Sequence, residues 1–99
     1  MSKRSNKYSI SDMYCCKCGN KNFGIGRKPV NYKEPGHLKI LYCIHCKQVW
    51  NHAEIRPIFN DYNYEDFKLE MEYNNFDDKG NRKEPYRVFR GNLKQKGII

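Results

Sequence analysis

The chain has 99 residues, with 19 Lys or Arg against 11 Asp or Glu and a formal net charge of +8 at pH 7. This length gives room for one small domain with a modest core, so we expect the fold to need a stabilising device. No run of about 18 apolar residues occurs and the first ten residues lack the apolar stretch of a signal peptide, so we expect a cytoplasmic protein in a reducing compartment, with no membrane partner.

Charge is distributed unevenly along the chain. Residues 1–47 carry ten basic and two acidic residues, residues 48–78 carry two basic and eight acidic residues, and residues 79–99 carry seven basic and one acidic. A uniform basic coat for nucleic acid would not show this pattern. We therefore expect any polyanion contact in the first half or the tail, with an acidic middle for a basic partner; a solvated mixed surface is the alternative.

The first half of the chain is expected to be a small β domain. Residues 1–9 are polar and basic and predict a flexible lead-in, followed by a domain at 10–53. Short alternating or apolar runs predict strands at 22–26, 37–42 and around 48–50, and Pro35-Gly36 predicts a turn between the first two. These strands would form a three-stranded antiparallel sheet.

The second half, residues 54–99, is expected to be an acidic and then basic extension. Apolar residues from Phe67 to Tyr73 alternate with charged ones, which favours a strand, although Phe67 and Met71 are also four apart as in a helix. Turn residues at 77–81 and the run from Pro85 to Arg90 then predict a β-hairpin over 66–90 with a loose tail. The expected fold class is small and mostly β.

Five cysteines indicate a metal site. An odd number without a secretory signal argues against a disulfide framework. In YCCKC, at residues 14–18, either Cys15 or Cys16 could pair with Cys18, but only Cys15 and Cys18 have the C-x-x-C spacing of Cys43 and Cys46. Two such turns complete a tetrahedron, which predicts a zinc ribbon with one structural Zn²⁺ or, as the alternative, an iron centre with the same ligands. Cys16 would be spare, and His45 would face outward.

The segment at 13–52 resembles a known family of transcription proteins. The residues CKCGNKNF, a 24-residue interval from Gly19 to Tyr42 and then CIHCKQVW are similar to the C-terminal zinc ribbon of the elongation factor that induces transcript cleavage by RNA polymerase II. Related ribbons occur in small RNA polymerase subunits, and Trp50 matches the tryptophan that follows the last ligand of the family. The resemblance implies a partner in transcription: RNA polymerase, DNA or RNA.

One departure from that family changes the expected function. The acidic pair that reaches the polymerase active site in the family corresponds here to Glu34 and Pro35. Because one ligand group is lost, we expect a binding module without catalysis, and no small-molecule substrate. The basic and aromatic residues expected to contact the partner or nucleic acid are Arg27, Lys28, Tyr32, Lys33, Lys39 and Lys47. Phe23, Tyr42 and Trp50 are expected to pack around the zinc.

Two other functions stay open at this point. The amino-acid usage, rich in Lys, Asn, Ile and Tyr with a single Ala, is typical of an AT-rich genome such as that of a phage, and a viral protein that occupies a host target could use the acidic middle. A nuclease of the HNH type would need a histidine base beside a metal ligand. His37 has no such neighbour in the sequence, and each histidine is expected to be exposed to solvent.

Overall fold

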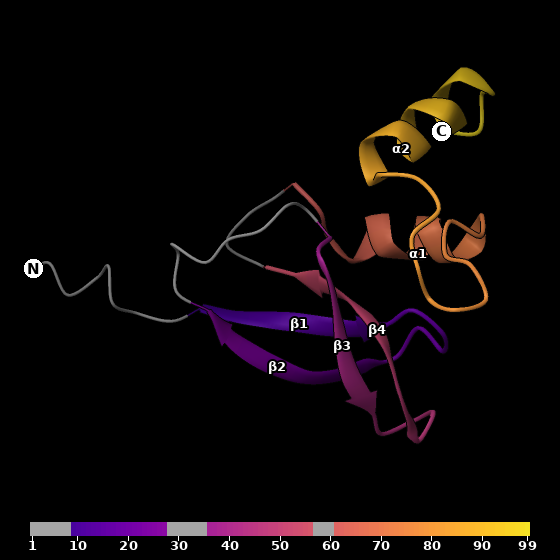
Figure 1. Ribbon diagram of the computed structural model, residues 1–99. Coiled ribbons are helices and arrows are strands. Elements are labelled where there is room, and N and C mark those ends of the chain that lie inside the picture. Colours follow the sequence, from indigo (N-terminus) through magenta and orange to yellow (C-terminus); the bar gives the residue numbers. More distant parts are fainter. Residues whose placement is uncertain (1–8, 28–35, 57–60) are drawn as a thin grey trace, which may run out of the picture.

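The computed structural model describes residues 9–27, 36–56 and 61–99, and Figure 1 shows a sheet with two helices beside it. Four strands and two helices occur in the described residues. In chain order they are β1 (Ser9–Cys15), β2 (Lys21–Arg27), β3 (Leu38–Cys43), β4 (Gln48–Ile55), α1 (Tyr64–Glu72) and α2 (Tyr86–Gln95). Neither helix is long and apolar enough to cross a membrane.

The strands form one antiparallel sheet in the order β2-β1-β4-β3. Two hairpins, β1–β2 and β3–β4, are joined through their inner strands, where Tyr14 pairs with Ala53 and Cys15 with His52. The expectation of three strands is therefore wrong by one. The additional strand is β1, in which a bulge between Ser11 and Met13 interrupts the alternation of side chains that identifies a strand in a sequence.

The hairpin expected at 66–90 is also wrong, because α1 and α2 occupy this region. A capping box begins α1: the Asn63 side chain accepts from the backbone N–H of Asp66, and the Asp66 carboxylate accepts from the backbone N–H of Asn63. The core-facing residues Phe67 and Glu70 are three apart, as in a helix. The capping box therefore favours the helix, although the alternation in residues 67–73 favours a strand.

The hydrophobic core lies between the sheet and α1. The ring of Phe67 is 5.4 Å from that of Tyr14 on β1 and 6.0 Å from that of Phe76 after α1. Figure 1 shows α1 between the sheet and α2, so α2 stands at the outer side of the molecule. The buried members of this core are Cys16, Ala53, Ile55, Tyr62, Phe67 and Phe76.

A buried ion pair connects the C-terminal segment to the sheet. Arg82 donates to the Glu70 carboxylate, at 2.7 Å from Nε and 3.0 Å from Nη2, and its Nη1 donates to the carbonyl of Gly36 at 2.8 Å. Gly36 has a φ of 70°, and a Cβ there would lie 2.9 Å from Arg82 Nη2. A glycine is required at this point, just before β3, for the guanidinium to reach the backbone.

Candidate metal centre

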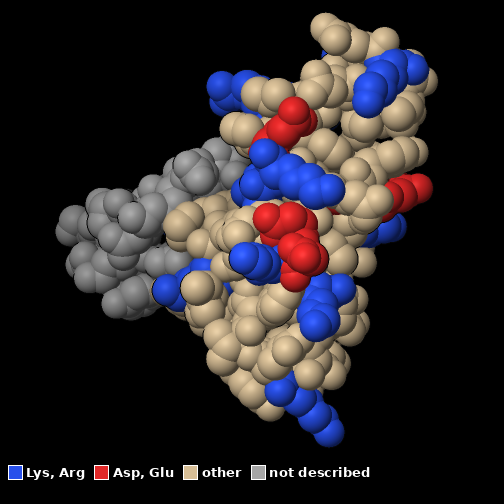
Figure 2. Space-filling model, turned by 45° about the vertical axis from the view of Figure 1, so that its right-hand side comes forward, with Lys and Arg blue, Asp and Glu red and all other residues tan. Residues whose placement is uncertain are grey.

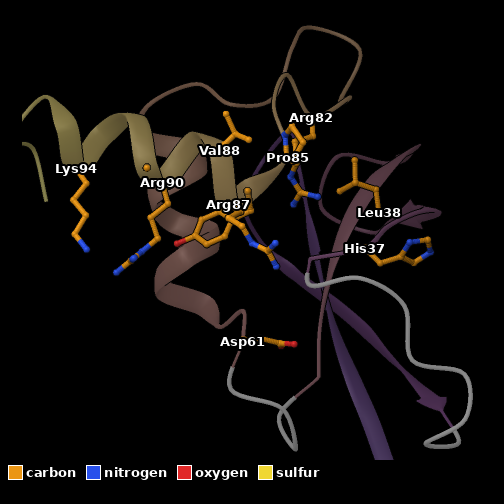
Figure 3. A pocket seen from close by; sticks show the side chains of 11 residues that line it. His37, Leu38, Asp61, Arg82, Pro85, Arg87, Val88, Arg90 and Lys94 are labelled. Atoms are coloured by element: carbon orange, nitrogen blue, oxygen red, sulfur yellow. The ribbon is translucent and has the colours of Figure 1, made fainter.

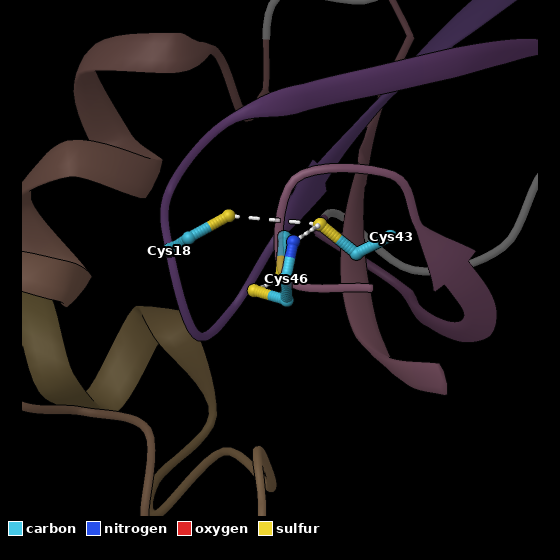
Figure 4. A group of neighbouring side chains, drawn as sticks. Cys18, Cys43 and Cys46 are labelled. Atoms are coloured by element: carbon cyan, nitrogen blue, oxygen red, sulfur yellow. Dashed lines mark hydrogen bonds between the residues drawn. The ribbon is translucent and has the colours of Figure 1, made fainter. Parts of the chain in front are cut away.

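The tips of the two hairpins bring four cysteines together. Cys15 and Cys18 belong to the β1–β2 turn, and Cys43 and Cys46 to the β3–β4 turn, and Figure 4 shows the turns facing each other with sulfur atoms between them. All four sulfur atoms lie within 4.8 Å of one another. Cysteines that are distant in the sequence therefore meet. The Sγ atoms of Cys15 and Cys46, which are 31 residues apart, lie 3.8 Å from each other, and those of Cys18 and Cys43, which are 25 residues apart, lie 3.6 Å from each other.

The two turns repeat the same backbone geometry. In the first, the N–H of Gly19 donates to the carbonyl of Cys15 at 2.9 Å, and in the second the N–H of Lys47 donates to the carbonyl of Cys43 at 2.7 Å. The residue that closes each turn has a positive φ, 77° at Gly19 and 60° at Lys47. Each turn also directs a backbone N–H to its first sulfur, from Lys17 to Cys15 and from Cys46 to Cys43. Such donors stabilise thiolates.

Two of the sulfur–sulfur distances fit a tetrahedral ion. With Zn–S bonds of about 2.3 Å, the sulfur atoms of a tetrahedral Cys₄ site are separated by about 3.8 Å. The distances of 3.8 Å and 3.6 Å between the sulfur pairs match this spacing. The group could therefore hold a metal ion, with four coordination positions supplied by protein.

A buried polar chain supports one of these ligands. Asn22 on β2 donates from Nδ2 to the sulfur of Cys43 at 3.3 Å and bonds the His52 ring at Nε2, at 2.9 Å, while its Oδ1 accepts from the N–H of Ile44 at 3.1 Å. His52 Nδ1 is 2.9 Å from the carbonyl of Trp50, so the neutral ring with hydrogen on Nδ1 satisfies every partner. Burial opposes ionisation of Cys43, but donors including the Cys46 N–H and Asn22 lower the pKa of its thiol to about 6.

Cys16 lies outside the group of four. Its side chain is buried in the core between the sheet and α1, among Ala53 and Phe67. Burial in this apolar surrounding raises the pKa of its thiol to about 12, which keeps it protonated and unreactive. Cys15 and Cys16 are both buried, but Cys15 belongs to the group of four sulfur atoms and Cys16 to the core, because successive residues point to opposite sides of the chain.

The histidines and aromatics differ from expectation. His52 is fully buried rather than exposed, and both of its ring nitrogens have partners, Asn22 and the carbonyl of Trp50. Phe23 and Tyr42 were expected to pack around the metal, but they are 72 % and 53 % exposed and lie on β2 and β3, the two outer strands of the sheet. Trp50 is half-buried, with the Lys17 ammonium 4.8 Å from its ring centroid.

The six expected contact residues are only partly placed by the structure. Lys28, Tyr32 and Lys33 lie outside the described residues, as do Glu34 and Pro35. Arg27 ends β2, Lys39 is half-buried on β3 and Lys47 is exposed in the second cysteine turn. The three members of the set that the structure describes therefore lie on β2, on β3 and in the β3–β4 turn. Sequence reasoning missed Asn22 and His52, since neither belongs to a spacing that signals a metal site.

Comparisons with known proteins add no relative. No family model matches the sequence, and neither a curated protein nor a solved structure matches it significantly. The resemblance of residues 13–52 to the ribbons of transcription proteins therefore stays a prediction.

Proposed function

We propose that this chain is a zinc ribbon that acts in transcription as a non-catalytic binding module, contacting RNA polymerase, nucleic acid or both. The observation that carries the proposal is the set of four thiols at the tips of two hairpins, all within 4.8 Å of one another, because such a set is suited to hold a tetrahedral Zn²⁺. Cys15, Cys18, Cys43 and Cys46 would hold the ion. A site with four protein ligands has no open position for water or substrate, so the ion would be structural.

An apolar surface near the metal turns supports a protein partner. Tyr42 and Val49 are direct neighbours across β3 and β4, and Ile40 lies two residues from Tyr42 on the same face. Ile40, Tyr42 and Val49 are 67 %, 53 % and 59 % exposed. Exposed apolar side chains that gather in one place are a feature of protein interaction sites. This surface suits contact with a protein such as RNA polymerase.

The charged surface supports a second kind of contact. Figure 2 shows one face of the molecule, on which basic side chains are spread from the α2 end to the opposite tip, with acidic side chains in smaller groups between them. The acidic residues of the middle segment are concentrated on α1, where Glu65, Asp66, Glu70 and Glu72 occur. Phosphate would be attracted to the remaining basic regions, at α2 and along the ribbon.

The environments of the histidines favour binding over nuclease chemistry. A nuclease of the HNH type needs a histidine that can take a proton from water or substrate. His52 is fully buried with both nitrogens engaged, and His45 lies in the second cysteine turn. Metal-ion catalysis also needs an ion with an open position, whereas four thiols saturate this one.

The test measures direct binding to purified partners. RNA polymerase from the source cell is immobilised, the zinc-loaded chain is passed over it, and binding to DNA and RNA is followed separately by gel shift. We expect saturable binding to at least one of these partners, with stalled transcription complexes showing no shortened transcript. Failure to bind the polymerase and both nucleic acids, or cleavage of transcript or probe, would contradict the proposal.

A further inference from the structure

A cleft of about 1010 Å³ lies between α2 and the beginning of β3. Figure 3 shows α2 along one side of it, with His37 and Leu38 on another and Asp61 opposite. Arg82 also lines the cleft, but its charge is neutralised by Glu70. Leu38, Pro85 and Val88 supply apolar lining. Its volume is at the upper limit of small-molecule pockets, about 300–1,000 Å³, so it suits a segment of a polymer.

Three cations of α2 line this cleft. Arg87, Arg90 and Lys94 are spaced by three and four residues, which places them on one face of the helix. Figure 3 shows their side chains extending toward the side on which Asp61 lies. All three are exposed, and among the described residues no salt bridge includes any of them. No acidic residue occurs in α2 to neutralise this face.

Gly91 lies among these cations, four residues after Arg87 and three before Lys94. A Cβ at this position would have no atom within 4 Å, so no packing contact within the protein requires a glycine. A glycine inside a helix costs about 1 kcal/mol relative to alanine. A bare stretch of helix backbone in a cationic cleft does allow a ligand to approach closely.

We propose that this cleft binds the phosphodiester backbone of a nucleic acid, with Arg87, Arg90 and Lys94 contacting phosphates and Gly91 leaving room for the strand. The inference deepens the proposed function and rests on it, because it assigns a surface of the same module to its nucleic-acid partner. This surface lies on α2, outside the ribbon residues that the sequence indicated.

The charge pattern favours nucleic acid over an acidic peptide. Arg87 and Lys94 are seven residues apart, or about 10.5 Å along the helix, which equals about three base steps of 3.4 Å. A row of cations matches the regular charges of a phosphate backbone, and the two arginines can each bind a phosphate through two N–H groups. The apolar side chains of Leu38 and Val88 provide contact for sugars or bases.

The experiment measures binding by fluorescence anisotropy with the zinc-loaded full chain. The probes are a labelled single-stranded DNA of about 12 nucleotides, within the usual site sizes of about 4–16 nucleotides, its duplex, the matching RNA and a labelled polyglutamate peptide. Gly91→Glu and Gly91→Gln place side chains of equal size in the cleft, and only the first adds a negative charge. We expect Gly91→Glu to bind DNA about five- to tenfold more weakly than Gly91→Gln at low salt.

Arg90→Gln tests a single phosphate contact. The slope of log K against log salt should become shallower by about 0.7 for single strands or about 0.9 for duplex. Lys68→Gln on α1 removes a cation outside the cleft and serves as the control, with binding unchanged within twofold. Circular dichroism and zinc content identify any variant that fails to fold, and Arg87→Gln then replaces it.

The outcomes separate this inference from the proposed function. In one outcome, the cleft variants keep the DNA affinity and the salt slope of the unaltered chain while Lys39→Gln or Lys47→Gln binds DNA more weakly. This result would show that the cleft is not the nucleic-acid site, and it would leave the proposed function standing. Tighter binding of polyglutamate than of every nucleic-acid probe would overturn the choice of ligand. No binding of the unaltered chain to any nucleic acid would overturn the inference, while the polymerase assay decides the proposed function independently.

Discussion

Glu70 and Arg82 form a two-point ion pair in which the Glu70 side chain has no exposure to solvent. Nε and Nη2 of Arg82 donate to the two carboxylate oxygens, and the Tyr62 hydroxyl donates to the same carboxylate. Burial and the neighbouring Glu70 charge raise the pKa of Tyr62, so this hydroxyl remains a donor. Arg82 also donates a hydrogen bond to the carbonyl of Gly36, just before β3. The ion pair therefore connects α1, the C-terminal segment and the beginning of β3.

Breaking this pair should destabilise the whole fold. Glu70→Ala leaves the buried guanidinium of Arg82 without its counter-charge, which we expect to lower the free energy of unfolding by about 3–5 kcal/mol in a urea titration. Lys68→Ala disrupts the exposed contact with Glu65 and should cost less than about 1 kcal/mol. Equal effects of the two substitutions would show that Glu70 does not organise the C-terminal segment.

Asn22 should control metal affinity without being a ligand. Asn22→Leu keeps the approximate volume but removes the donor to the Cys43 sulfur, so we expect zinc to bind about 10- to 100-fold more weakly in a chelator competition. Asn20→Leu alters an exposed side chain two residues earlier, in the β1–β2 turn, and should leave the affinity unchanged. Equal affinities of the Asn22 variant and the unaltered chain would rule out this supporting role.

The adjacent cysteines Cys15 and Cys16 should respond differently to substitution. Cys16→Ala should retain one metal ion per chain and lose about 1–2 kcal/mol of stability, because it removes a buried sulfur from the core. Cys15→Ala should lose the metal and unfold the sheet. Metal analysis after gel filtration distinguishes them, and a metal-free Cys16→Ala chain would show that the ligand set is wrong.

Two glycines should respond to alanine in opposite directions. Gly91→Ala places a methyl group in open space on α2 and should stabilise the protein by about 0.5–1 kcal/mol. At Gly80, with a φ of 84°, a Cβ would lie 2.6 Å from the Trp50 indole nitrogen, so Gly80→Ala should destabilise by more than about 1 kcal/mol. Thermal unfolding of both variants measures the difference; destabilisation by Gly91→Ala would mean that α2 packs differently.

The sequence allowed the cysteine group to be predicted because each C-x-x-C turn is a local feature, while β1 was missed because its bulge hides the alternation. The capping pair Asn63 and Asp66 precedes the ambiguous residues 67–73, so the periodicity alone favoured a strand. The partnership of Asn22 with Cys43 depends on the pairing of hairpins, and the basic face of α2 exists only once those residues are helical. The first feature is set by tertiary structure, and the second was hidden because the pattern of residues 85–90 predicts a strand.

Native mass spectrometry of the unaltered chain tests the central claim, a structural Zn²⁺ held by four thiolates. We predict the mass of one chain with one zinc ion, and loss of β-sheet circular dichroism when a strong chelator removes the ion, because binding of the metal and folding are coupled. A chain that keeps its sheet with no metal bound, or that carries iron in place of zinc after expression with both metals supplied, would contradict the account.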